Sequence, residues 1–303
     1  MKRVLSLNFF LALLAAVSLQ AHAINLSFCY IPGAGGGDAN SFEIFPRELA
    51  QRGVPFKGFD VRNKGSIQFH AQVFRDLLQA ELARDPDFRC HVLGFSQGGL
   101  VARYAIAHLI VQHPLLGARP LSDFVIALTT LSSPHFGTPL PRLIERTGIP
   151  IDEGESQLRD DRIHIFNEPA YPDTYSPEIP GIVYSSFRTW LGSASEATNT
   201  AKKFSFRMIF NDLQGRGLDP RNDSVVPFET QGFGKVLGDL RLPHGYFSKD
   251  YGIRPGPVDF YVHYWEYLAG LRAEPHPRFD PVSVEWAEDL TETMSLHDLR
   301  KEL

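Results

Sequence analysis

The stretch Cys90-His91-Val92-Leu93-Gly94-Phe95-Ser96-Gln97-Gly98 decides the fold. Its apolar first part leads into a G-x-S-x-G pattern, and a run with helical spacing, residues 100–109, follows. This order predicts a buried strand, a tight turn and a helix, with Ser96 held on the turn. A serine exposed there can attack a carbonyl carbon, so the pattern indicates a nucleophile. The alternative is a glycine-rich turn without chemistry.

Length and composition are typical of a globular enzyme. The chain has 303 residues, of which 43% are hydrophobic and 21% charged, and its formal net charge is −5. These values predict one large domain with its own core. Because no basic surface is indicated, we expect no nucleic-acid partner.

The first 23 residues are predicted to be a secretory signal peptide. Lys2 and Arg3 precede an apolar run over residues 4–19, and Ala21-His22-Ala23 supplies a cleavage motif of small residues. We expect cleavage after Ala23, a catalytic domain over 24–303, and a periplasmic or secreted protein. An uncleaved anchor is the alternative, although the apolar run is short for a membrane span.

The two cysteines, Cys29 and Cys90, are both expected on core strands that lie side by side. An oxidising compartment permits a disulfide between them. A bond across neighbouring central strands is geometrically awkward, so two buried thiols are the favoured alternative.

Strands and helices alternate through the first half of the chain. This alternation predicts the α/β class, with a mostly parallel sheet that has helices on both faces. The predicted strands cover residues 26–31, 55–61, 89–93, 122–131 and 205–209, and the predicted helices cover 41–51, 67–83 and 260–271.

The alternation stops over residues 140–203, where prolines and aromatic residues gather. We expect a lid-like insertion over the sheet, in which Phe187 and Trp190 bind the acyl chain of a substrate. The alternative is that these aromatic residues cover the sheet edge. Residues 284–303 are acidic and weakly apolar, which predicts a C-terminal helix or tail.

A nucleophilic serine needs a general base, and the base needs an orienting acid. In strand–turn–helix hydrolases the chain order is serine, acid, histidine. Asp223 and His244 follow Ser96 in that order, each in a segment with loop composition. The rivals that the sequence leaves open are His263 for the base, and Asp212 and Asp250 for the acid.

The reaction would also need N–H donors for an oxyanion. The Gln97 backbone N–H, at the start of the helix, is one candidate. The glycine-rich loop at residues 32–37 supplies the second, from Ala34 or Gly35. A phosphate-binding loop is the poorer alternative, because no G-K-[ST] ending follows.

Four segments of the chain resemble those of bacterial secreted α/β-hydrolase lipases of the triacylglycerol lipase type. This resemblance implies the α/β-hydrolase fold and the roles given above to Ser96, Asp223 and His244. The segments are residues 94–100 (G-H-S-x-G-G in the family), 131–139 (S-P-H-x-G-T), 222–227 (N-D-G-L-V-P) and 238–244, which ends at the histidine.

The chain departs from the family at three positions. Pro32 replaces a histidine of the oxyanion loop, and Phe95 replaces the elbow histidine, as in palmitoyl-protein thioesterases. Tyr246 stands where many of these lipases carry the first calcium-ligating aspartate, and Asp250 is the nearest acid. No cofactor or metal is therefore expected, with calcium left open.

Together these observations predict a serine lipase or esterase that cleaves long-chain acyl esters. The expected partners are a lipid or acyl ester and, transiently, a lipid interface. The alternatives are an acyl-protein (palmitoyl) thioesterase and a non-catalytic binding protein on a hydrolase scaffold.

Overall fold

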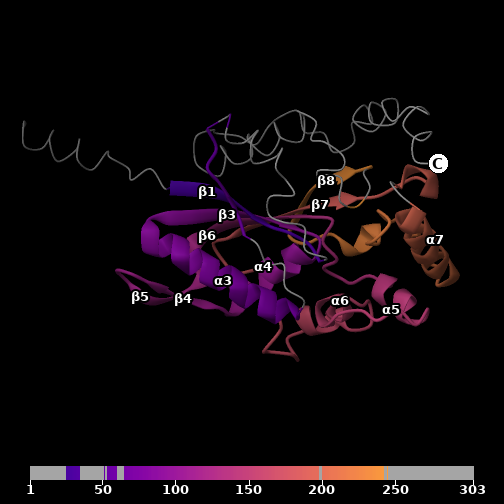
Figure 1. Ribbon diagram of the computed structural model, residues 1–303, viewed down its shortest axis with the longest axis horizontal. Coiled ribbons are helices and arrows are strands. Elements are labelled where there is room, and N and C mark those ends of the chain that lie inside the picture. Colours follow the sequence, from indigo (N-terminus) through magenta and orange to yellow (C-terminus); the bar gives the residue numbers. More distant parts are fainter. Residues whose placement is uncertain are drawn as a thin grey trace, which may run out of the picture.

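A six-stranded sheet forms the centre of the computed structural model, which describes residues 25–34, 51, 53–59, 65–197, 200–241 and 244 (Figure 1). The strand order is β2-β1-β3-β6-β7-β8, and every neighbouring pair is parallel. The strands are β1 (Asn25–Ile31), β2 (Phe56–Gly58), β3 (Phe88–Phe95), β6 (Val125–Leu131), β7 (Val183–Thr189) and β8 (Lys235–Leu240).

Two helices, α3 (Ile67–Arg84) and α4 (Gln97–His108), cover one face of this sheet (Figure 1). The hydroxyl of Ser66 caps α3 by accepting a hydrogen bond from the Phe69 N–H. The buried side chains of α3 recur every three or four residues, as in Phe74, Leu78 and Leu82. They pack with α4 and the sheet in one apolar core, so the helical spacing of the sequence is confirmed.

The other described elements lie between the strands of the central sheet along the chain. No helix among the described residues is long and apolar enough to cross a membrane. The connecting elements are the hairpin β4 (Ile110–His113) and β5 (Gly117–Pro120), the 3-10 turns η2 (Leu121–Phe124), η3 (Ile163–Phe166), η4 (Ala194–Glu196) and η5 (Phe228–Thr230), and the helices α5 (Leu140–Glu145), α6 (Glu153–Gln157) and α7 (Thr200–Gly215).

The insertion predicted over residues 140–203 includes strand β7, and for this strand the prediction is wrong. This strand lies between β6 and β8 and belongs to the central sheet. A proline- and aromatic-rich connection precedes it, and that composition concealed the return to the sheet. The first part of the segment, with α5, α6 and η3, does lie outside the sheet.

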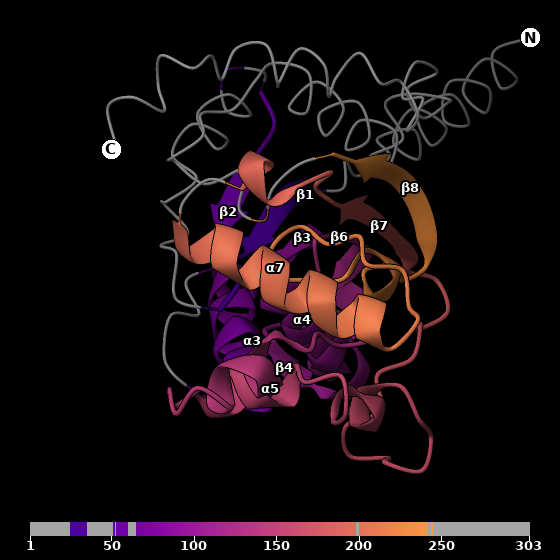
Figure 2. The ribbon, with the colours of Figure 1, turned by 90° about the vertical axis from the view of Figure 1, so that its right-hand side faces the viewer.

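The strand predicted over residues 205–209 is also wrong, because these residues lie inside helix α7. Phe204 and Phe206 alternate with polar residues as in a strand. The buried side chains, however, are Phe206, Ile209 and Leu213, which share one face of a helix. Figure 2 shows α7 lying across one end of the sheet.

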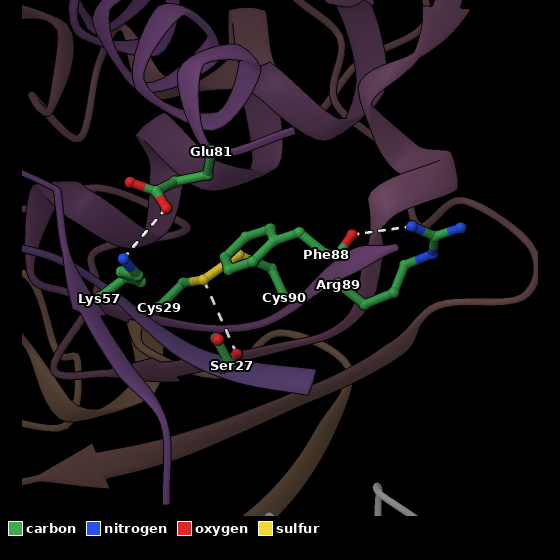
Figure 3. The surroundings of a disulfide bond; sticks show 7 residues. All are labelled: Ser27, Cys29, Lys57, Glu81, Phe88, Arg89 and Cys90. Carbon is green, nitrogen blue, oxygen red and sulfur yellow. Dashed lines mark hydrogen bonds and ion pairs between the residues drawn. A yellow bond between two sulfur atoms is a disulfide. The ribbon is translucent and has the colours of Figure 1, made fainter. Parts of the chain in front are cut away.

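Cys29 of β1 and Cys90 of β3 form a disulfide, against the favoured prediction of two free thiols (Figure 3). In the parallel register Cys29 lies opposite Val92 and Cys90 opposite Ser27, so the two cysteines are diagonal neighbours. Their Cα atoms are 5.8 Å apart, within the range that a disulfide spans. The diagonal offset therefore removes the expected difficulty.

The predicted signal peptide, the helix predicted over 41–51 apart from Gln51, the helix predicted over 260–271, and the tail over 284–303 lie outside the described residues.

Candidate active site

Ser96 lies on a strained turn between β3 and α4. Its φ of 53° and ψ of −126° are unusual for a residue with a side chain. The neighbouring glycines are required by close packing. A Cβ on Gly94 would lie 2.6 Å from the Cα of Gly99, and one on Gly98 would collide with the Ile31 carbonyl oxygen. The turn thus holds the serine hydroxyl at the carboxyl end of β3.

Three residues distant in the sequence meet at this turn. The Ser96 Oγ lies 3.0 Å from His244 Nε2, and His244 Nδ1 lies 2.8 Å from Asp223 Oδ2. All three side chains are buried, and His244 is 8% exposed. Because a carboxylate only accepts, Nδ1 carries the proton and leaves Nε2 able to accept the serine proton.

The Asp223 carboxylate accepts four hydrogen bonds in a fully buried position. Oδ1 accepts from the backbone N–H groups of Val225 (3.0 Å) and Val226 (2.8 Å). Oδ2 accepts from His244 and from the Thr189 hydroxyl, at 2.7 Å. Both carboxylate oxygens are therefore held in place, with Oδ2 directed at the imidazole of His244.

The loop that carries Asp223 follows helix α7, and not a strand as predicted. The side-chain carbonyl of Asn222 accepts from the Ser224 N–H at 2.9 Å, which turns the chain at this point. The His244 N–H donates to the Asp223 carbonyl at 2.9 Å, and Lys202 of α7 donates to the His244 carbonyl at 2.6 Å. His244 and Asp223, the predicted base and acid, are therefore joined through the backbone as well as through their side chains.

Among the rival residues, Asp212 lies on α7 and pairs with Arg142 and Arg216 at 3.2 Å each. Its carboxylate is therefore engaged in an ion-pair cluster with these two arginines. Asp250 and His263 lie outside the described residues.

The predicted oxyanion loop passes directly over the serine. A Cβ on Gly33 would lie 2.7 Å from the Ser96 Cβ, so only glycine permits this approach. Ala34 follows and is exposed, while Gly35 lies outside the described residues. Gln97 is the first residue of α4, where backbone N–H groups have no intrahelical acceptor. The oxyanion roles of Ala34 and Gln97 remain predictions.

The two residues predicted to bind an acyl chain have different surroundings. Phe187 is buried within β7, next to Leu131 of β6. The Trp190 ring is flanked by the guanidinium groups of Arg221 and Arg241, at 5.9 and 5.5 Å from its centroid. Substrate binding by either residue remains a prediction.

Sequence reasoning missed Arg103, a buried arginine of helix α4. Burial lowers its pKa to about 9. Its guanidinium donates to the Ser176 carbonyl at 2.7 Å and to Asn167 Oδ1 at 3.1 Å, and it lies 3.8 Å from the centroid of the Phe233 ring. Arg103 therefore fastens the segment after α6 to helix α4. No motif marks it, because its acceptors are mainly backbone carbonyls.

The same arginine fixes His135, which follows β6. Arg103 donates to His135 Nδ1 at 3.2 Å, so His135 Nε2 donates to the Thr130 hydroxyl at 3.0 Å. Burial and the neighbouring positive charge hold the pKa of His135 well below its usual value. The geometry therefore gives His135 a structural role.

Within the described residues, no three His, Cys, Asp or Glu side chains lie together in a way that would hold a metal ion. Tyr246 and Asp250, on which the calcium prediction depends, lie outside them.

Solved structures with the same architecture include several bacterial lipases and esterases. The mature lipase BlEst2 of Bacillus licheniformis is 15% identical with a TM-score of 0.57, covering 78% of this chain and 90% of its own. The metagenomic carboxyl esterase MGS0156 is 14% identical with a TM-score of 0.58, covering 82% and 77%. Lipase 1 of Pelosinus fermentans is 16% identical with a TM-score of 0.53, covering 82% and 99%.

The chain has the α/β-hydrolase fold. A family model described as "Putative serine esterase (DUF676)" matches residues 52–147. This match includes Ser96 but neither Asp223 nor His244. A search of curated protein sequences found no match.

Proposed function

We propose that this protein is a serine carboxylic-ester hydrolase. The observation that carries the proposal is the line of hydrogen bonds from Ser96 through His244 to Asp223, at the carboxyl end of a parallel sheet. The match to a serine esterase family around Ser96 and the likeness to lipase and esterase structures support it.

The geometry supports acyl transfer through a covalent intermediate. His244 Nε2 takes the Ser96 hydroxyl proton as Oγ attacks the ester carbonyl carbon, and Asp223 stabilises the resulting imidazolium. The alcohol leaves with that proton, and the acyl group remains on Oγ. Water then attacks the acyl-enzyme, His244 accepts its proton, and the carboxylic acid departs with Ser96 regenerated.

The tetrahedral intermediates need donors for their negative oxygen. We assign these to the backbone N–H groups of Gln97 and Ala34. Gln97 opens α4, whose dipole favours a negative charge at that point. The close contact of Gly33 with the Ser96 side chain brings the loop that carries Ala34 next to the serine.

The substrate class is inferred from the segment outside the sheet. We propose long-chain acyl esters at a lipid interface, with the part of 140–203 that precedes β7 acting as a cap and with Phe187 and Trp190 near the acyl chain. The proposed location is periplasmic or secreted, after removal of residues 1–23. The buried Cys29–Cys90 disulfide supports an oxidising compartment.

A fluorophosphonate probe tests the reaction class. Wild type should become labelled on Ser96, and Ser96→Ala should not. Hydrolysis of p-nitrophenyl butyrate by wild type, and its loss in the variant, should accompany the labelling. A folded wild type that neither reacts with the probe nor hydrolyses the ester would refute the hydrolase proposal. The non-catalytic binding protein would then be the remaining alternative.

A substrate panel tests the finer assignment. Phe95, whose ring lies 5.0 Å from that of His244, takes a place that a histidine holds in the lipases and keeps the thioesterase alternative open. We expect higher kcat/KM for palmitoyl esters than for palmitoyl thioesters. The reverse order would assign the protein to the thioesterases.

A further inference from the structure

A threonine outside any motif touches the acid of the proposed triad. The Thr189 hydroxyl lies 2.7 Å from Asp223 Oδ2, the oxygen that also accepts from His244. Because an ionised carboxylate has no proton to give, Thr189 is the donor. Thr189 is the last residue of β7 and is 2% exposed, so water does not substitute for this bond.

The Thr189 hydroxyl is itself held in place. The Thr189 oxygen lies 3.2 Å from Gln231 Oε1, but Asp223 Oδ2 is closer and charged and is the stronger acceptor for its single proton. The Thr189 oxygen therefore accepts from the Ser132 hydroxyl, 2.6 Å away. Ser132 directly follows β6 and has a φ of 52°, a left-handed conformation that is uncommon for serine. The strained turn aims its hydroxyl across to the end of the next strand.

The backbone of Thr189 is fixed by Gln231. The Gln231 amide oxygen accepts from the Thr189 N–H at 2.6 Å, and its Nε2 donates to the Thr189 carbonyl at 2.9 Å. Nε2 also lies 3.3 Å from the carbonyl of Val226, in the loop that carries the acid. Gln231 is fully buried, so one side chain joins the end of β7 to that loop.

We propose that Thr189 is a positioning residue for Asp223, supported by Ser132 and Gln231. The carboxylate torsion of an aspartate is soft, and the backbone donors of Val225 and Val226 hold only Oδ1. Thr189 fixes Oδ2, and with it the direction in which the carboxylate meets His244. The inference rests on the proposed function and adds a residue that acts through the acid.

Three variants test the assignment. Thr189→Val removes the hydroxyl at nearly constant volume, Thr189→Ser keeps it, and Thr129→Val is a matched control. Thr129 is a fully buried threonine of β6 whose hydroxyl meets His91 at 2.8 Å and Ser185 at 2.9 Å, within the sheet.

With p-nitrophenyl butyrate, Thr189→Val should lower kcat about 10- to 100-fold, as for a lost hydrogen bond to a charged group, with KM changed less than threefold. Thr189→Ser should stay within about threefold of wild type. Thr129→Val should lower the Tm but leave kcat unchanged. Unchanged kcat in Thr189→Val, or equal losses in the Val and Ser variants, would overturn the assignment.

A readout without substrate separates this inference from the proposed function. The proton between His244 Nδ1 and Asp223 should give a far-downfield NMR signal in wild type and Thr129→Val, and a weakened or missing one in Thr189→Val. Wild type inactive on every ester would refute the function while this signal still tests the positioning. An unaltered signal in Thr189→Val would refute the positioning alone.

Should Thr189→Val fail to fold, Ser132→Ala replaces it. This variant removes the donor to the Thr189 oxygen and should lower kcat severalfold, with the downfield signal broadened. A Ser132→Ala protein with wild-type kcat and an unaltered signal would contradict the proposal.

Discussion

Two buried hydrogen-bond networks cross the same pair of strands, β6 and β7, and each contains one histidine. In one network His244 faces the carboxylate of Asp223, and in the other His91 faces the neutral hydroxyl of Thr129. The triad network comprises Ser132, Thr189, Asp223, His244 and Ser96, and the sheet network comprises Ser185, Thr129 and His91.

The two networks differ mainly in their position along the strands. Thr129 and Ser185 lie within β6 and β7, whereas Ser132 and Thr189 lie where those strands end. Burial lowers the pKa of His91 to about 3. The same residue types thus hydrogen-bond neighbouring strands in the interior of the sheet. At its carboxyl edge they hydrogen-bond the proposed catalytic groups, because loops there can add an acid and a nucleophile.

The largest expected effect comes from breaking the triad network at its nucleophile. Ser96→Ala should lower kcat/KM for p-nitrophenyl butyrate by about 10⁴- to 10⁶-fold, because no other group can carry the acyl intermediate. Its Tm should stay close to that of wild type. A residual rate within tenfold of wild type on purified protein would refute the role of Ser96.

The disulfide joins β1 to β3, the strand that bears His91 and leads to Ser96. Cys29→Ser/Cys90→Ser should lower the free energy of unfolding by about 4 kcal/mol, because the bond closes a loop with a sequence separation of 61. Urea denaturation measures this change. Under conditions in which it is folded, the double variant should keep its kcat, although both networks depend on β3. Wild type treated with a reductant should show the same free energy of unfolding and the same kcat as the double variant.

Acid should destabilise the folded protein through His91 of the sheet network. The pKa of His91 is about 3 in the folded chain and 6.5 in the unfolded chain, so only the unfolded chain takes up a proton between these values. The contribution of neutral His91 to the free energy of unfolding is complete above about pH 6.5. It falls by about 1.4 kcal/mol per pH unit as the pH drops toward 3. His91→Asn, measured by urea denaturation at several pH values, should show a shallower decline. An equal slope in wild type and variant would contradict the assignment to His91.

The smallest expected effect concerns Ser224, beside the acid but outside the triad network. Its φ is 84°, and its buried Oγ makes no hydrogen bond within the described part of the chain. Ser224→Gly should raise the free energy of unfolding by about 1 kcal/mol and the Tm by about 2–4 °C, because both costs disappear. Ser224→Ala removes only the hydroxyl and should gain less. A lower Tm in the glycine variant would refute this account.

The sequence was most informative where the chemistry demands a local pattern. The turn at Ser96 needs glycines on both sides, and α3 needs apolar residues at helical spacing, so both are legible in the sequence. Strand β7 could not be recognised in the sequence because its flank is rich in proline. Helix α7 could not be recognised because alternating phenylalanines conceal its helical period. Tertiary packing decided both cases.

Thr189 shows a different limit of sequence reasoning. Nothing near it in the sequence distinguishes it from other threonines of a strand. Its importance comes from the registry of β6 with β7 and from a loop more than thirty residues further on. Such a residue is found only once the strand ends are placed side by side.

The separation of Ser96 from its base has a consequence for the order in which the protein becomes reactive. The two residues lie 148 positions apart, so about 7–30 s of synthesis separate them at ordinary ribosomal rates. Until residue 244 emerges, the serine has no partner to take its proton. A nascent chain stalled before that point should therefore ignore a fluorophosphonate probe. The cell that makes the protein is shielded from its chemistry while the polypeptide is still being assembled.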